Sequence, residues 1–240
     1  MTVMEIQPVE QLFRRVRAWS PDRHEPVVVS AMPSPLTIVG TGTDAVVVAH
    51  PARPDRVYKV YADEALPALA DEHEAYQRLA GCPLFATCLG RGDNYLVLSY
   101  EAGPTLYDCL VEGIPVEPEV MADVEAARHQ ARRRGLHPKD VHLKNVIVQD
   151  GRAKMIDVSK YVAPGDDDPV WEALAEAYRR YYPAIRGRAV PVWLIETVKR
   201  VYREQDPGGA FSLDAFAQRM LKLAKVLRFG SGRRTPLEAA

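Results

Sequence analysis

The sequence predicts an α+β protein with two lobes, a small β-rich N-terminal lobe that carries one helix and a mainly helical C-terminal lobe. The first half holds short runs of β-branched and aromatic residues separated by Gly, Pro and Asp, which favours strands. In the second half apolar residues recur at helical spacing. With 240 residues, 47% of them hydrophobic and 26% charged, the chain can bury a substantial core.

The N-terminal lobe is predicted to span residues 1–98. A short helix is expected over 6–19, where apolar residues recur every three or four positions up to Ser20 and Pro21. One longer helix is expected over about 63–80. The predicted strands cover the segments 27–29, 36–39, 45–49, 56–61 and 95–100.

The C-terminal lobe is predicted to span residues 99–228, followed by a flexible tail over 229–240 that is rich in Gly, Ser and Arg at its start. Two short strands, about 145–149 and 153–157, flank the turn at Asp150 and Gly151. The segments with helical periodicity are 116–134, 169–183, 191–204 and 212–227.

Several classes of protein are disfavoured by composition. A formal net charge of -1 gives no reason to expect binding to nucleic acid or to an anionic membrane. The three cysteines do not follow the spacing of a zinc site and suit a reducing compartment. The N-terminus lacks the apolar run of a signal peptide, and no segment approaches the roughly 20 apolar residues of a membrane span. We therefore expect a cytoplasmic protein; the sequence does not define its oligomeric state.

Phosphate handling is indicated by three features of the N-terminal lobe. Gly40 and Gly42 lie between two predicted strands, where alternate glycines let the backbone approach a phosphate group closely. Lys59 lies on an otherwise apolar strand, and such a lysine needs an acidic partner to orient it. Glu72 is the preferred partner because it shares a helix face with apolar residues, whereas Glu74 points elsewhere.

The predicted catalytic centre is the stretch from Asp140 to Asn145, which also contains His142 and Lys144, followed by Asp157. Asn145 opens one predicted strand and Asp157 closes the next, so their side chains can converge on one point with Asp140. Phosphoryl transfer needs such a set, because one carboxylate accepts the proton of the attacking hydroxyl while oxygen ligands hold Mg²⁺.

The ordered set resembles the protein-kinase-like superfamily over roughly residues 35–160. The resemblance implies the cofactors ATP and Mg²⁺, with Asp140 as catalytic base and Asn145 and Asp157 as metal ligands. It also implies an adenine-holding segment over 98–103. The ATP-binding residues would be Gly40, Gly42, Lys59, Glu72, Ser99 and Tyr100.

The departures from the family pattern predict a compact, atypical member similar to short eukaryotic-like serine/threonine kinases of bacteria. The residues before the base are Pro138 and Lys139 instead of His-Arg, and Asp157 is followed by Val-Ser instead of Phe-Gly. No Ala-Pro-Glu triplet follows, so control by phosphorylation of a long activation segment is not expected. Constitutive activity or control by a partner is expected instead.

Three functions follow from these residues. The leading prediction is a kinase that acts on a Ser or Thr hydroxyl of a protein substrate. His142 also resembles the aminoglycoside and choline kinases, which predicts a small hydroxylated acceptor as an alternative, with the acidic run Asp166 to Asp168 facing a cationic substrate. The altered residues after Asp157 allow a third possibility, a pseudokinase that serves as a binding scaffold.

Overall fold

A central antiparallel sheet forms the N-terminal half of the protein. The computed structural model describes residues 11–21, 25–165 and 170–203. The sheet has the strand order β3-β4-β5-β7-β6. Its strands are β3 (Thr37–Thr41), β4 (Ala45–Ala49), β5 (Arg56–Tyr61), β6 (Cys88–Arg91) and β7 (Tyr95–Ser99). β5 lies in the middle and is almost wholly buried, which is why its sequence is nearly continuously apolar around one lysine.

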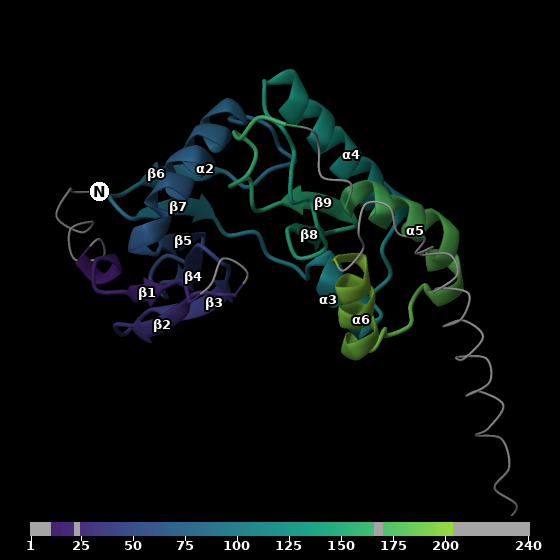
Figure 1. The fold of residues 1–240 in the computed structure, drawn as a ribbon, viewed down its shortest axis with the longest axis horizontal. Helices are drawn as coiled ribbons and strands as arrows, with labels where there is room; N and C mark the ends of the chain where they lie inside the picture. The colour runs from purple at the N-terminus through teal and green to yellow at the C-terminus, as the bar shows by residue number, and fades with distance from the viewer. Residues whose placement is uncertain (1–10, 22–24, 166–169, 204–240) are drawn as a thin grey trace, which may run out of the picture.

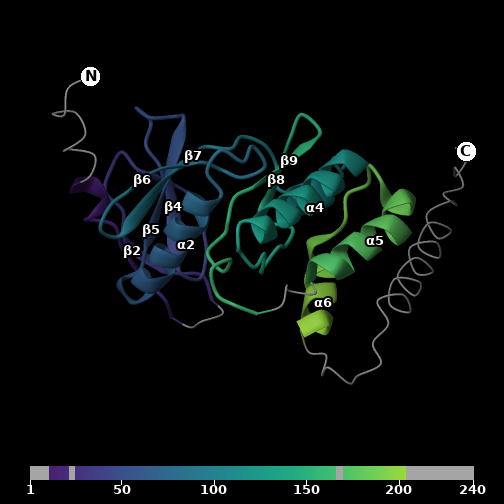
Figure 2. The same cartoon turned by 90° about the horizontal axis from the view of Figure 1, so that it is seen from above.

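Helix α2 (Leu66–Arg78), preceded by a 3-10 turn over Asp63–Ala65, covers one face of this sheet. Its buried positions recur at helical spacing, at Leu69, Glu72, Ala75 and Tyr76. The helix contacts the strands β6 and β7, and Figure 2 shows it beside the sheet. A buried glutamate therefore faces the middle of the sheet.

The N-terminal segment covers the opposite face. The Phe13 ring stacks on Tyr58 of β5 at 4.0 Å between centroids and tilts against Tyr95 of β7 at 4.8 Å. Beyond Val16, the strand β1 (Arg17–Trp19) pairs antiparallel with β2 (Val28–Ala31). The predicted helix over 6–19 is therefore wrong at its C-terminal end, because residues 17–19 satisfy their backbone by pairing with a neighbouring strand.

The second half of the protein is mainly helical and lies beside the sheet in Figure 1. It contains α3 (Leu106–Glu112), α4 (Pro118–Arg133), the hairpin of β8 (Val146–Gln149) and β9 (Arg152–Met155), α5 (Val170–Ile185) and α6 (Val192–Arg203). None of the helices among the described residues is long and apolar enough to cross a membrane. The predicted helix 212–227, the acidic run 166–168 and the tail 229–240 lie outside the described residues.

A carboxylate joins α4 to the hairpin. Asp123 accepts hydrogen bonds from Arg152 at 2.6 and 2.7 Å and from the backbone amide of Ala153 at 3.0 Å. The hairpin is thus fixed against α4.

The link between the two halves runs through the strand β9. The amide of Met155 donates to Leu84, and the amide of Ala86 donates back to the carbonyl of Met155. The hydroxyl of Tyr76, at the end of α2, donates to the carbonyl of Ile156 at 2.9 Å. These bonds hold the end of β9, and Asp157 after it, beside the buried face of α2.

Candidate functional site

A lysine between two carboxylates lies where the halves meet. The Nζ atom of Lys59 lies 2.6 Å from Oε2 of Glu72 and 3.1 Å from Oδ2 of Asp157. The three residues come from β5, α2 and the loop after β9. The Lys59–Glu72 contact proposed from helix spacing is present, and Glu74 instead pairs with Arg78 on the outer side of α2.

Burial makes this contact electrostatically strong. Glu72 is fully buried and Lys59 only 8% exposed. Burial lowers the pKa of Lys59, but the charges of Asp157 and Glu72 outweigh it, so the pKa is raised and the ammonium stays protonated. Burial raises the pKa of Glu72 to about 6 against the opposing effect of Lys59.

Tyr61 is a member of the site that the sequence interpretation missed. It lies two residues after Lys59 on the same face of β5, and its hydroxyl donates a short hydrogen bond to Oε2 of Glu72. The other oxygen, Oε1, is buried and has no hydrogen-bond partner among the residues that the structure describes. Two donors therefore fix one oxygen of Glu72.

Asp157 is oriented from its own loop. Its Oδ1 atom accepts hydrogen bonds from the amide of Ser159 at 3.0 Å and from the hydroxyl of Ser159 at 2.7 Å. Burial raises the pKa of Asp157, but Lys59 and Ser159 together lower it below its ordinary value. The carboxylate of Asp157 is ionised at neutral pH. Ser159, in the place of the Gly of the family's Asp-Phe-Gly triplet, holds this carboxylate by two hydrogen bonds.

Asp140 lies in a constrained loop. Its backbone has a φ of 57°, in the left-handed region that Asp and Asn tolerate better than most residues. The side-chain amide of Asn145 donates to the carbonyl of Asp140 at 3.1 Å. The carbonyl of Asn145 accepts from the amide of Ile156 at 3.1 Å, so the loop and the segment before Asp157 are tied together.

The site contains a second lysine, Lys160, which contacts Asp140 and which the sequence interpretation missed. The Nζ atom of Lys160 lies 2.9 Å from Oδ2 of Asp140. Burial lowers the pKa of Lys160, but Asp140 raises it, and Asp44 and Asp157 act in the same direction, so the net shift is upward. Asp44 belongs to the turn after Gly42. The sequence signal for Lys160 was its place three residues after Asp157, the predicted metal ligand.

His142 and Lys144 differ in their surroundings. Nε2 of His142 lies 3.6 Å from Oδ1 of Asp140. Burial, joined by Lys199 and Lys160, lowers the pKa of His142 despite the two nearby carboxylates, which favours the neutral ring at pH 7. The ammonium of Lys144 lies over the Tyr107 ring, 4.6 Å from its centroid, which ties Lys144 to α3.

Gly40 and Gly42 lie in the β3–β4 hairpin. The amide of Gly42 donates to the carbonyl of Ala45 at 2.9 Å, and Gly40 pairs with Val47. A Cβ atom at either glycine would meet its nearest neighbour at 3.8 and 3.6 Å, which is ordinary contact. Internal packing therefore does not require glycine at these two positions.

In the segment predicted to hold adenine, the backbone amides of Ser99 and Tyr100 form hydrogen bonds within the protein. The Ser99 amide donates to Thr87 and the Tyr100 amide donates to Asp55. The Ser99 hydroxyl donates to Glu101 at 2.5 Å and accepts from the Thr87 amide at 2.8 Å. The backbone donors of Ser99 and Tyr100 are thus engaged within the protein.

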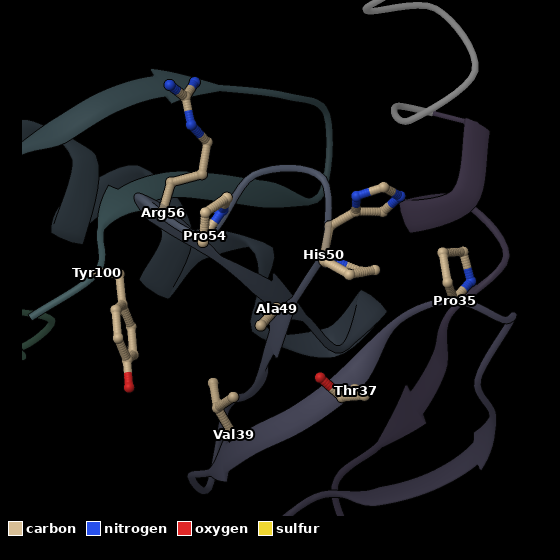
Figure 3. Close-up of a pocket in the computed structure, with 9 residues that line it drawn as sticks. Pro35, Thr37, Val39, Ala49, His50, Pro54, Arg56 and Tyr100 are labelled. Atoms are coloured by element: carbon tan, nitrogen blue, oxygen red, sulfur yellow. The ribbon is translucent and has the colours of Figure 1, made fainter. Parts of the chain in front are cut away.

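The side chain of Tyr100 borders an open hollow of about 280 Å³. Figure 3 shows its ring facing Val39 and Ala49, while the Arg56 guanidinium extends away from them. Ala49 of β4 pairs with Thr37 of β3 and with Val57 of β5, so the three side chains share one face of the sheet. Lys59 lies on the same face, because it follows Val57 by two residues along β5. The lining consists of Pro35, Thr37, Val39, Ala49, His50, Pro51, Pro54, Arg56 and Tyr100.

No group of three His, Cys, Asp or Glu side chains among the described residues is arranged to hold a metal ion alone. Asn145 and Asp157 offer one amide oxygen and one carboxylate beside Asp140. Such a small oxygen set suits Mg²⁺, which completes its coordination with water and phosphate oxygens.

Comparison with known proteins gives one informative relative. No family model matches the chain. The chain is 30% identical over 172 residues to a protein of Bacillus subtilis (strain 168) named "Putative serine/threonine-protein kinase YrzF", and the match covers 70% of this chain and 80% of that protein. This similarity agrees with the kinase-like resemblance of the motifs. The chain therefore belongs to the kinase-like family of this Bacillus subtilis protein.

Proposed function

We propose that the protein is an ATP- and Mg²⁺-dependent phosphotransferase with the two-lobed arrangement of kinases, an N-terminal lobe over 1–98 and a catalytic lobe over 99–228. The observation that carries the proposal is the buried Lys59 ammonium, held between Glu72 and Asp157. A lysine paired with a helix glutamate and lying next to a metal-binding aspartate is the arrangement that phosphoryl transfer requires in kinases.

The proposed nucleotide lies on the sheet face that Lys59 shares with the hollow beside Tyr100. The adenine ring would occupy the hollow, where Val39 and Ala49 offer apolar surface. Lys59 lies two residues along β5 from Val57, the strand partner of Ala49 in the hollow, about 7 Å away at strand spacing. The phosphates would then reach Lys59 beneath the hairpin that carries Gly42, whose lack of a side chain leaves the backbone accessible to them.

Asn145 and Asp157 would hold Mg²⁺, which neutralises phosphate charge when bound. Asp140 would accept the proton of the attacking hydroxyl as the new O–P bond forms and the bond from the terminal phosphorus to its bridging oxygen breaks. The ordered loop around Asp140 supports this role, because a base must be aimed before the acceptor arrives.

We propose a Ser or Thr hydroxyl of a protein as the acceptor. The support is the name of the Bacillus subtilis relative, "Putative serine/threonine-protein kinase YrzF".

The cysteines Cys82, Cys88 and Cys109 are all free, which suits the reducing compartment in which we expect the protein to act.

The test is transfer of labelled phosphate from Mg²⁺-ATP to generic protein substrates, to the protein itself and to small hydroxylated amines. We expect transfer to protein by the wild type and its loss in Asp140→Asn and Asp157→Asn, with circular dichroism unchanged. Transfer to the amines alone would refute the protein acceptor. The absence of nucleotide binding in calorimetry would refute the enzyme and leave a scaffold.

A further inference from the structure

Lys160 occupies a position from which it can act on the transferred group. Its ammonium lies 2.9 Å from Asp140, the proposed base, and it follows Asp157, the proposed metal ligand, by three residues. We propose that Lys160 is a second catalytic lysine, which binds the terminal phosphate group of the nucleotide during transfer. The proposal rests on the phosphotransferase function proposed above.

The backbone holds Lys160 firmly toward the site. The residues Val158 and Tyr161 on either side of it are buried at 0% and 1% exposure. The Tyr161 amide donates to the carbonyl of Val158 at 3.1 Å, and the carbonyl of Tyr161 accepts from the His137 amide at 2.8 Å. A turn anchored in this way leaves the Lys160 side chain, 55% exposed, to extend outward to Asp140.

The negative charges of the site call for a cation in addition to Lys59. Lys59 is already shared between the carboxylates of Glu72 and Asp157. Asp140 and a terminal phosphate group would both be negative and would have to approach one acceptor oxygen, which costs Coulomb energy in a partly buried site. Lys160 already neutralises Asp140, so its ammonium can lie between the two anions.

This placement gives the transfer step a defined charge balance. The acceptor hydroxyl loses its proton to Asp140 while its oxygen forms a bond to the terminal phosphorus. The bond between that phosphorus and the bridging oxygen breaks, and the nucleoside diphosphate leaves. Lys160 donates to the equatorial oxygens of the transferred group, where a charged hydrogen bond is strongest in the transition state.

Binding measurements separate this role from a structural one. Calorimetry would compare Mg²⁺-ADP with the Mg²⁺ complex of a non-hydrolysable ATP analogue in wild type, Lys160→Met and Lys160→Arg. We expect Lys160→Met to weaken the analogue about tenfold, the worth of about one charged hydrogen bond, and to leave the ADP affinity within about twofold. The rate of transfer should fall about a hundredfold or more, with partial recovery in Lys160→Arg.

Lys139→Met is the matched control, because Lys139 lies in the same region and its ammonium donates to the carbonyl of Pro164 at 2.7 Å. It removes the same charge, and we expect both affinities to stay within about twofold of wild type. Equal affinity of the analogue for wild type and Lys160→Met, or equal loss of ADP and analogue binding, would overturn the role of Lys160 while the phosphotransferase function stands. A wild type that binds neither nucleotide would overturn both.

Discussion

Replacing Glu72 by Gln isolates the charge of the buried carboxylate from its shape. In the wild type, one oxygen of Glu72 accepts from both Lys59 and Tyr61 inside the protein. In Glu72→Gln the ammonium of Lys59 remains buried and keeps only the carboxylate of Asp157, 3.1 Å away, as a charged partner. The change therefore leaves a buried cation partly uncompensated.

The size of the effect follows from this arrangement. Removing one partner of a buried ion pair costs about 3–5 kcal/mol, and the remaining contact with Asp157 places Glu72→Gln near the lower end, about 3 kcal/mol. At a urea slope of about 3 kcal/mol per molar, the midpoint of unfolding should fall by about 1 M. Phosphate transfer should fall about a hundredfold, because Lys59 loses the group that fixes its position.

Glu74→Gln is the control, since it lies two residues away on α2 and its carboxylate pairs with Arg78 at the surface. We expect its urea midpoint to change by less than about 0.3 M, because an exposed pair contributes less than about 1 kcal/mol. Equal urea midpoints for the two variants, or full transfer activity in Glu72→Gln, would refute the reasoning.

Further predictions concern pH and stability. The pKa of His142, lowered by burial, should lie below about 6.5 in an NMR titration. The neutral His142 ring therefore contributes to stability above about pH 6.5, and this contribution is lost as the pH falls. Between pH 7 and pH 5, the free energy of unfolding in urea should fall more in wild type than in His142→Gln. A pKa above 6.5 would contradict this. Asp123→Ala should cost about 2 kcal/mol in urea unfolding, because the buried carboxylate of Asp123 accepts hydrogen bonds from Arg152 and from the amide of Ala153. A cost below about 0.5 kcal/mol would contradict this. Phe13→Ala should cost about 3–4 kcal/mol and Trp19→Ala, half exposed, about 1 kcal/mol or less; the reverse order would refute the packing of this segment on the sheet.

The strands and helices with strong local patterns could be predicted from the sequence. The segments 45–49 and 56–61 coincide with β4 and β5, because each combines β-branched residues with a clear boundary. Besides β1, which was expected to be helical, two elements were missed. β6 has the sequence Cys-Leu-Gly-Arg, which carries no strand pattern of its own, and it forms by pairing with β7. α3 has only seven residues, and its sequence signal is the capping box of Thr105 and Asp108.

The candidate site was predictable where residues lie on periodic elements. Glu72 could be chosen over Glu74 from helix spacing, because only one face of α2 is apolar. The contact of Lys160 with Asp140 depends on how a loop of irregular backbone folds back, and no periodic signal in the sequence encodes that. The engaged amides of Ser99 and Tyr100 are likewise tertiary contacts, made by Thr87 and Asp55.

The left-handed backbone at Asp140 decides which inactive variant is a useful reagent. Asn shares the tolerance of Asp for this conformation, whereas Ala would add about 1–2 kcal/mol of strain to the loop. An Asn side chain also keeps an oxygen that can face an acceptor hydroxyl without taking its proton. Asp140→Asn should therefore retain an undistorted loop and form stable complexes with nucleotide and acceptor, which makes it the variant with which to capture the physiological substrate.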